Sequence, residues 1–262
     1  MFTIKDKVAL VTGAGSGIGL HYVKEMFRNG LRAATIADID PSKGDQALKE
    51  IAQEFGSNKA IFVKTDVTVQ KEVEAAFKKT IEAFKNLDIV INNAGILNDD
   101  IWEKQIAINI NGTVYGCLLA WDYLQKYRSG NEGVIVNIAS ITGLTSFMSI
   151  PVYAATKHAI VGLSKSMGVK EHYDRTKIRV LTICPGVTDT PLISDFVTSY
   201  CLPAFEATYK VDLPRWPKQK PEVVAKGLIQ ALTTGTNGSF WVVNNSKIQN
   251  IPHLPEVLEL PK

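Results

Sequence analysis

Short apolar runs alternate with longer amphipathic stretches along most of this chain. The runs are rich in Val, Ile and Ala, and such runs are typical of strands that are buried on both faces of a sheet. In the stretches between them, apolar residues recur at the three- and four-residue spacing of a helix. We predict strands at residues 8–12, 33–38, 60–66, 89–92, 134–138, 180–183 and 240–243. We predict helices at residues 18–29, 42–55, 70–84, 102–127, 153–173 and 221–232.

This alternation predicts the α/β class, with a doubly wound parallel sheet that carries helices on both faces. Because no linker or internal repeat interrupts it, we expect residues 1–262 to form a single domain. Two segments lack the pattern. Residues 186–220 are rich in Pro, aromatic residues and loop formers, so we expect a functional lid, or small helices of its own. Residues 244–262 hold three prolines and are expected to form an irregular tail.

The first predicted strand leads into Thr12-Gly13-Ala14-Gly15-Ser16-Gly17-Ile18-Gly19 and then into a helix. Glycines at such a turn allow tight bending, close approach to a pyrophosphate and close packing of the helix on the strand. The helix N-terminus offers unpaired N–H groups to phosphates. A glycine-rich turn alone is weak evidence, but its place in the first βα unit favours a dinucleotide site. The expected contacts are Gly13, Ser16, Gly17, Ile18 and Gly19.

The second strand ends at Asp38, about 20 residues beyond the last glycine. A carboxylate there accepts hydrogen bonds from both ribose hydroxyls and repels a 2′-phosphate. Arg32 precedes the strand, and Ile39 and Asp40 follow it, so we expect no arginine or lysine to be placed to receive a phosphate. The sequence therefore predicts NAD rather than NADP. The alternative is a solvated acid at a strand end.

Polar residues also follow the third and fourth strands, namely Asp66-Val67 and Asn92-Asn93-Ala94-Gly95. Open α/β sheets bind ligands outside the carboxyl ends of their parallel strands. We therefore expect Asp66, Val67, Asn93, Ala94 and Gly95 to contact the cofactor. Taken singly, the two asparagines are also ordinary turn formers.

Candidate chemistry lies after the fifth strand, where Ser140 is followed by Tyr153 and Lys157. On a helix, residues four apart share a face, so the phenol and the ammonium are neighbours. A free tyrosine has a pKa of about 10, and a nearby positive charge lowers that pKa. Tyr153 then exchanges a proton with the substrate oxygen while Ser140 donates a hydrogen bond to it. A Tyr–Lys pair at this spacing also occurs on many ordinary helices.

Taken together, TGAGSGIG, Asp38, Asp66-Val67, NNAG, Ser140 and Tyr153-x-x-x-Lys157 resemble the short-chain dehydrogenase/reductase family over nearly the whole chain. The resemblance implies a seven-stranded Rossmann sheet and a dinucleotide-binding catalytic domain. It also implies that Asn109 completes the Ser–Tyr–Lys centre, with a local helix distortion and a water that links Asn109 to Lys157. An exposed, idle asparagine is the alternative. Tyr153 and Lys157 are implied to contact the cofactor too.

The sixth strand is followed by Pro185-Gly186-Val187-Thr188, which resembles the family's loop at the nicotinamide carboxamide. Pro185, Gly186 and Thr188 are therefore implied cofactor contacts, although Pro-Gly is also a common turn. The resemblance places the substrate pocket over Tyr153. Its implied walls are Ile96-Leu97, Ile141-Thr142-Gly143-Leu144, Phe147-Met148-Ser149-Ile150, Leu192-Ile193 and Phe196.

Composition excludes several other classes. The net charge is +3, and 29 basic residues are scattered among 26 acidic ones, so we expect no nucleic-acid partner. Three separated cysteines favour a reducing compartment, and the four histidines show no ligand spacing, so we expect no metal. No window approaches the roughly 18 apolar residues of a membrane span. With no leader pattern at the start, we expect a cytoplasmic protein.

These features predict an NAD-dependent alcohol dehydrogenase that interconverts a secondary alcohol and a ketone on an apolar small molecule. Within the family, the segments around Asn93, Tyr153 and Pro185 are most similar to NAD-linked 15-hydroxyprostaglandin dehydrogenases and insect alcohol dehydrogenases. A prostaglandin-like or steroid hydroxy-group dehydrogenase is the alternative, with Ile150 in place of those prostaglandin enzymes' glutamine. A non-catalytic nucleotide-binding protein on the same fold is a further alternative. The long helices at 102–127 and 153–173 resemble subunit-pairing helices, which implies a homodimer or homotetramer.

Overall fold

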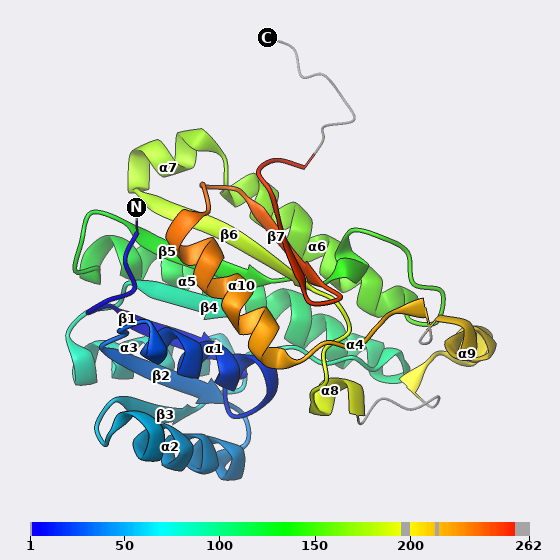
Figure 1. Cartoon of the computed structure of the whole chain (residues 1–262), viewed down its shortest axis with the longest axis horizontal. Coiled ribbons are helices and arrows are strands. Elements are labelled where there is room, and N and C mark those ends of the chain that lie inside the picture. Colours follow the sequence, from blue (N-terminus) through cyan, green and yellow to red (C-terminus); the bar gives the residue numbers. More distant parts are fainter. Residues whose placement is uncertain (1, 195–199, 213–214, 255–262) are drawn as a thin grey trace.

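A computed structural model describes residues 2–194, 200–212 and 215–254. At its centre lies a sheet of eight strands in the order β3-β2-β1-β4-β5-β6-β7-β8 (Figure 1). The strands are β1 (Val8–Thr12), β2 (Ala33–Asp38), β3 (Ala60–Lys64), β4 (Ile89–Asn92), β5 (Gly133–Ile138), β6 (Ile178–Pro185), β7 (Phe240–Asn244) and β8 (Lys247–Ile251). All neighbouring pairs are parallel except β7 and β8.

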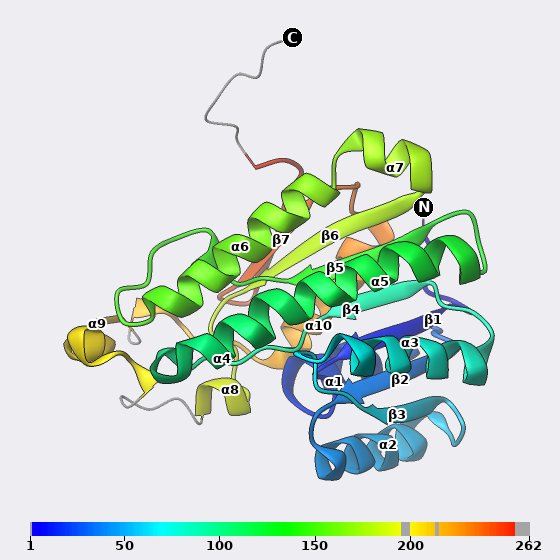
Figure 2. The same cartoon turned by 180° about the vertical axis from the view of Figure 1, so that it is seen from behind.

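Helices cover both faces of the sheet, which confirms the predicted doubly wound α/β class. One face carries α1 (Gly17–Arg28), α2 (Pro41–Phe55) and α10 (Pro221–Thr234) (Figure 1). The other carries α3 (Gln70–Phe84), α5 (Gly112–Tyr127) and α6 (Pro151–Met167) (Figure 2). From β1 to β3 the strands are added on one side of β1, whereas β4 and the later strands are added on its other side. The topological switch point therefore lies between β1 and β4. Ligands bind outside such a point in this class of sheet.

Burial on both faces explains the continuous apolar runs. In β1, Ala9 and Val11 belong to the core under α1, α2 and α10, whereas Leu10 belongs to the core under α3 and α5. In β4, Ile89 and Ile91 face the first core and Val90 faces the second. Since successive side chains point to opposite faces, a strand between two helix layers needs an apolar residue at every position.

The eighth strand was not predicted, because it lies where an irregular tail was expected. β8 pairs antiparallel with β7 through a two-residue turn, in which Asn245 and Ser246 have positive φ angles of 49° and 58°. Two successive residues with positive φ are typical of a type I′ hairpin turn. The strand itself is largely polar and exposed at the edge of the sheet, so its sequence lacks the apolar signal of the central strands.

Two predicted helices are interrupted. The segment 102–127 forms α4 (Trp102–Ile106), one π-helical turn (Ala107–Asn111) and then α5. The segment 153–173 breaks at Gly168, and α7 (Lys170–Thr176) follows. A Cβ at Gly168 would lie 2.7 Å from the Gly238 α-carbon, so the backbone turns there against another loop. The segment expected as a lid carries α8 (Pro191–Ser194), a 3-10 turn (Pro203–Thr208) and α9 (Tyr209–Asp212).

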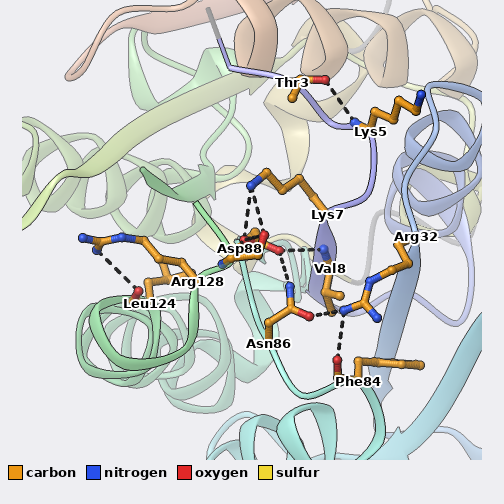
Figure 3. A network of polar contacts seen from close by, with 11 residues as sticks. Thr3, Lys5, Lys7, Val8, Arg32, Phe84, Asn86, Asp88, Leu124 and Arg128 are labelled. Carbon is orange, nitrogen blue, oxygen red and sulfur yellow. Dashed lines mark hydrogen bonds and ion pairs between the residues drawn. The ribbon is translucent and has the colours of Figure 1, made fainter. Parts of the chain in front are cut away.

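A buried carboxylate joins the amino ends of the central strands (Figure 3). Asp88 precedes β4 and is fully buried. It accepts hydrogen bonds from the Val8 N–H, from the Asn86 amide and from the N–H and hydroxyl of Ser129, and the Lys7 ammonium lies 3.5 Å away. This network joins the strands at their amino ends, opposite to the candidate site at their carboxyl ends.

Candidate active site

A cleft of about 580 Å³ lies at the carboxyl ends of the strands, and residues of α8 and α9 line part of it. With one exception, every residue that the sequence nominates for cofactor binding or catalysis lines this cleft. They are Gly13, Ser16, Gly17, Ile18, Gly19, Asp38, Asp66, Val67, Asn93, Ala94, Gly95, Ser140, Tyr153, Lys157, Pro185, Gly186 and Thr188. The exception is Asn109, which lies behind the wall of the cleft.

The glycine turn after β1 is held by the end of β4. The Asn93 side chain donates to the carbonyls of Thr12 and Gly13, and the Thr12 hydroxyl accepts the backbone N–H groups of Asn93 and Ala94. Gly13 has a φ of +63°, and a Cβ there would lie 2.8 Å from the Ala94 α-carbon. A Cβ on Gly19 would lie 2.4 Å from the Gly13 carbonyl oxygen. Only glycine therefore fits at both positions, and the turn and the start of α1 line the cleft.

Asp38 ends β2 beside this turn. Its carboxylate accepts the Gly15 N–H at 2.9 Å and the Asp40 N–H at 3.1 Å. A Cβ on Gly15 would lie 2.9 Å from the Asp38 carboxylate and 3.0 Å from the Cβ of Lys43. Lys43, in the first turn of α2, therefore stands next to Asp38 and also lines the cleft. The sequence analysis missed it because it lies five residues beyond Asp38, across a helix start.

Asp66 and Val67 lie in the turn after β3, which ends at Lys64 rather than at residue 66 as predicted. The reason is local: the Asp66 carboxylate accepts the N–H and the hydroxyl of Thr68, which turns the chain toward α3. Val67 is buried, and a Cβ on Gly112 would lie 2.8 Å from its side chain. This turn forms the cleft wall next to the fourth strand's NNAG segment.

Ser140, Tyr153 and Lys157 converge at the inner end of the cleft, and all three are buried. Ser140 follows β5; its hydroxyl accepts the Thr142 N–H at 3.1 Å and hydrogen-bonds the phenol of Tyr153. Tyr153 and Lys157 come from the first turns of α6, and the Lys157 ammonium lies 5.6 Å from the centre of the Tyr153 ring. The ammonium donates to the Ile138 carbonyl at 3.0 Å.

Burial dominates the electrostatics of this group. It lowers the pKa of Lys157 to about 8, and it raises the pKa of Tyr153 above its ordinary value. The hydrogen bond from Ser140 opposes the rise, and the negative charge of Asp99 adds to it. The expectation that Lys157 lowers the pKa of Tyr153 is therefore wrong for the protein's own groups, because desolvation of the phenolate is the larger effect.

Asn109 occupies the π-helical turn that the resemblance implied as a helix distortion. Its side-chain oxygen accepts the Ile96 N–H at 2.9 Å, and its amide donates to the Ile96 carbonyl and to the Thr156 hydroxyl. A Cβ on Gly95 would lie 3.2 Å from the Asn109 oxygen and 3.6 Å from the Lys157 nitrogen. Asn109 is thus neither exposed nor idle: it fixes the segment after β4 against α6.

The loop after β6 is fixed by a residue that the sequence analysis did not nominate. Gln219 is buried, and its amide donates to the Val243 carbonyl at 2.6 Å and to the Thr188 hydroxyl at 3.4 Å. The Thr188 hydroxyl also donates to the Gly186 carbonyl at 2.8 Å. Backbone bonds between residues 187–189 and Gln219 join the two ends of the lid segment. Only the fold brings these positions together, so no local motif indicates Gln219.

The wall beside Tyr153 is largely apolar. Of the side chains implied as pocket walls, Ile96, Leu97, Ile141, Thr142, Phe147, Ser149, Ile150, Leu192 and Ile193 line the cleft. Phe147 stacks on Trp216, with ring centres 5.2 Å apart. Gly143, Leu144 and Met148 do not line the cleft, and Phe196 lies outside the described residues.

Polar groups also border this wall. Asp212 of α9 accepts hydrogen bonds from the N–H and hydroxyl of Ser149. Tyr200, Tyr209 and the exposed Lys104 complete the border. The pocket is therefore less uniformly apolar than the sequence implied.

Asp99 is a third residue that the sequence analysis missed. It is fully buried in the turn before α4, and its carboxylate accepts the backbone N–H groups of Val152 and Tyr153, each at 2.8 Å. The catalytic helix thus receives its N-terminal cap from a distant segment. An Asn-Asp-Asp sequence in a loop gives no sign of such a partner.

In the described part of the chain, no helix is both long and apolar enough to cross a membrane. Among the same residues, no three His, Cys, Asp or Glu side chains are grouped to hold a metal ion.

Comparison with known proteins adds independent findings. The family model described as short chain dehydrogenase matches residues 7–199. The chain is 32% identical over 249 residues to the NAD(+) 15-hydroxyprostaglandin dehydrogenase of Mus musculus, covering 93% of this chain and 92% of that protein. It is 32% identical over 252 residues to alcohol dehydrogenase 1 of Ceratitis cosyra, covering 95% and 96%. A 3-ketoacyl-(acyl-carrier-protein) reductase from Brucella melitensis, solved with NADH, shares the fold with a TM-score of 0.76 at 24% identity, covering 92% of this chain and 98% of that one.

Proposed function

Since this chain belongs to the short-chain dehydrogenase family, we propose that it is an NAD-dependent oxidoreductase that interconverts a secondary alcohol and a ketone on an apolar small molecule. One observation carries the proposal. Ser140, Tyr153 and Lys157 meet at the inner end of a cleft whose outer end holds the glycine turn and Asp38. The two ends together match what a dinucleotide and a reacting alcohol require.

The residues at the outer end fit NAD. The glycine turn and the start of α1, which line the cleft, suit a pyrophosphate, and the Asp38 carboxylate, held by two backbone N–H groups, suits ribose hydroxyls. Asp66, Val67, Asn93, Ala94 and Gly95 would form the inner wall, and Pro185, Gly186 and Thr188 the far wall. When bound, NAD supplies a ring that accepts a hydride from an alcohol or returns it to a ketone.

At the inner end, the protein's task is proton transfer. The Tyr153 phenolate takes the hydroxyl proton of an alcohol, or the neutral phenol returns a proton to a ketone. Ser140 donates a hydrogen bond to the same substrate oxygen and holds it near the phenol. Because burial raises the pKa of Tyr153 even with Lys157 beside it, the phenolate requires further positive charge, which an oxidised nicotinamide ring would add to that of Lys157.

Asn109 supports this proton transfer. We retain the water link between Asn109 and Lys157 as part of the proposal. What supports it is the position of Gly95, where an added Cβ would lie 3.2 Å from the Asn109 oxygen and 3.6 Å from the Lys157 nitrogen, so both polar atoms border the space that a side chain would fill. The Thr156 hydroxyl, which accepts from Asn109, also donates to the Tyr153 carbonyl. Asn109 would therefore help to position Tyr153, through Thr156, as well as Lys157.

The apolar wall favours an alcohol with an apolar body. Burying each methylene group contributes about 0.8 kcal/mol, whereas a charged substrate without a partner must be desolvated. A prostaglandin-like or steroid hydroxy-group dehydrogenase is the second candidate, favoured by the similarity to the prostaglandin enzymes. Ile150 is buried and apolar, so it offers a substrate hydroxyl no hydrogen bond.

The test is NADH formation at 340 nm along secondary alcohols of increasing chain length, beside steroids, polyols and hydroxy acids. We expect kcat/KM to rise over the first carbons and then to level off where the pocket ends. Equal rates along the series, or a faster reaction with a polyol, would contradict an apolar pocket.

Other expectations stay predictions. We propose one catalytic domain with residues 186–220 as substrate lid, in a cytoplasmic homodimer or homotetramer. Of the tail expected at residues 244–262, β8 belongs to the sheet. The 60% exposure of Leu118 on α5 supports pairing through the long helices. Size-exclusion chromatography with light scattering tests it.

A further inference from the structure

The turn before α4 buries a carboxylate beneath the first turn of the catalytic helix. Asp99 has no exposed surface, and its oxygens accept the N–H groups of Val152 and Tyr153. The residue at the N-cap position of α6, Ile150, has no side chain that can do this. The cap is therefore supplied by a residue more than 50 positions away along the chain.

Burial of this charge needs compensation. Among the described residues, no lysine, arginine or histidine forms an ion pair with Asp99. The compensation comes from the two N–H groups and the positive end of the α6 dipole. The Asp99 carboxylate thus lies at the N-terminal end of the helix that carries Tyr153 and Lys157.

A second contact connects Asp99 to the π-helical turn. The buried Gln105 of α4 donates to the Asp99 carboxylate at 2.7 Å and accepts the Asn98 N–H at 2.6 Å. Asn109 follows Gln105 by four residues. The carboxylate therefore joins the segments that position Asn109 and Tyr153.

We propose that Asp99 is a positioning residue for hydride transfer, which fixes the backbone of Tyr153 and, by its charge, favours the proton-bearing phenol. This inference rests on the function proposed above. The charge raises the pKa of Tyr153, so its removal lowers the pH at which the phenolate forms. A cap without electrostatic influence would alter stability and leave that pH unchanged.

The experiment compares Asp99→Asn with wild type. Asp100→Asn, at the exposed neighbouring position, is the matched control. The first readout is kcat for alcohol oxidation from pH 6 to 10. For Asp99→Asn we expect a 10- to 100-fold lower kcat, about the cost of a misplaced reacting group. We also expect the rising limb of the profile to move down by about 0.5–1 pH unit, as expected for loss of a nearby charge.

The second readout needs no turnover. NAD+ affinity, followed by tryptophan fluorescence over the same pH range, rises as Tyr153 ionises, and Tyr153→Phe removes that rise. We expect the midpoint of this rise to fall in Asp99→Asn and to stay unchanged in Asp100→Asn. If wild type binds NAD+ but oxidises no alcohol, the proposed function fails, while this midpoint still decides the role of Asp99.

An unchanged midpoint in folded Asp99→Asn would overturn the proposal, even if kcat falls. Should Asp99→Asn not fold, Asp99→Ser replaces it, since a serine oxygen still caps the helix without charge. The same lower midpoint is expected. If neither variant folds, Asp99 serves stability alone and the proposal is wrong.

Discussion

The buried Lys157 shows how a single residue sets a pH dependence. Burial lowers its pKa from 10.5 to about 8 in the folded protein. Between these values, the unfolded chain binds more protons than the folded one, so stability rises as the pH rises from about 8 to 10.5. The buried ammonium therefore lowers the free energy of unfolding at neutral pH. The role proposed for Lys157 beside Tyr153 explains why such a group is buried.

We expect this cost to be measurable as a difference between variants. Between pH 7 and 10.5, the free energy of unfolding of wild type should rise by about 3 kcal/mol relative to Lys157→Met, since one pKa unit is worth about 1.4 kcal/mol. Denaturant unfolding at several pH values measures it, with the exposed Lys126→Met as control. Parallel curves for wild type and Lys157→Met would contradict the lowered pKa.

Asp38 sets the second residue-level prediction. Replacing it with alanine removes the repulsion of a 2′-phosphate and leaves Lys43 able to pair with one. We expect the wild-type preference for NAD, about 30- to 1,000-fold in kcat/KM, to fall strongly. The control is Asp45→Ala, an exposed acid on α2, the helix that carries Lys43. An unchanged cofactor ratio in Asp38→Ala would show that the carboxylate does not set the preference.

Among the elements, the π-helical turn between α4 and α5 does most to shape the site. Such turns recur at functional sites, where they reorient a side chain. Here the turn aims Asn109 at the backbone of Ile96 and at Thr156. The turn thus couples the segment after β4 to α6.

We expect Asn109→Ala to lower kcat by at least tenfold and the free energy of unfolding by about 1–3 kcal/mol, because it leaves the buried backbone groups of Ile96 unpaired. Asn111→Ala, at an exposed position in the same turn, should change neither. Equal effects of the two substitutions would show that kcat and stability depend on the turn as a whole and not on the Asn109 side chain.

The strands were the most predictable elements. Each of the seven parallel strands carries an apolar run, and the central strands β1, β4, β5 and β6 are buried between two helix layers. β8 could not be predicted, since an edge strand needs few apolar residues and is defined by its pairing with β7. The break at Gly168 depends on its contact with Gly238, which only the fold creates.

Across the whole molecule, the carboxyl ends and the amino ends of the strands have different roles. The cleft lies at the carboxyl ends of the strands, whereas the Asp88 network lies at their amino ends (Figure 3). Asp88→Ala leaves a lysine and several buried donors without their acceptor. We expect it to lower the free energy of unfolding by about 3–5 kcal/mol with kcat/KM nearly unchanged in the folded protein. Asp122→Ala, which breaks an exposed ion pair, should cost less than about 1 kcal/mol. A large loss of kcat/KM in folded Asp88→Ala would show that catalysis in the cleft depends on the Asp88 network.

Most residues that line the candidate site could be predicted from the sequence. The glycine turn, Asp38 and the Ser–Tyr–Lys set carry their chemistry in their own side chains and spacing. Asp99 and Gln219 act on the backbones of distant segments, so the sequence alone offers no sign of them. The pKa of Tyr153 was mispredicted for the same reason, since burial is a property of the fold.

The central claim is that Tyr153 is the acid/base of an NAD-dependent alcohol oxidation, and Tyr153→Phe tests it most directly. The substitution removes the phenolic oxygen and keeps the shape of the ring, so fold and NADH binding should be preserved. The measurement is the single-turnover rate of NADH formation with a saturating secondary alcohol. We predict a fall of about 10²–10⁴-fold, the usual loss of general acid–base catalysis. A variant that binds NADH normally and retains more than about a tenth of the wild-type rate would contradict the claim.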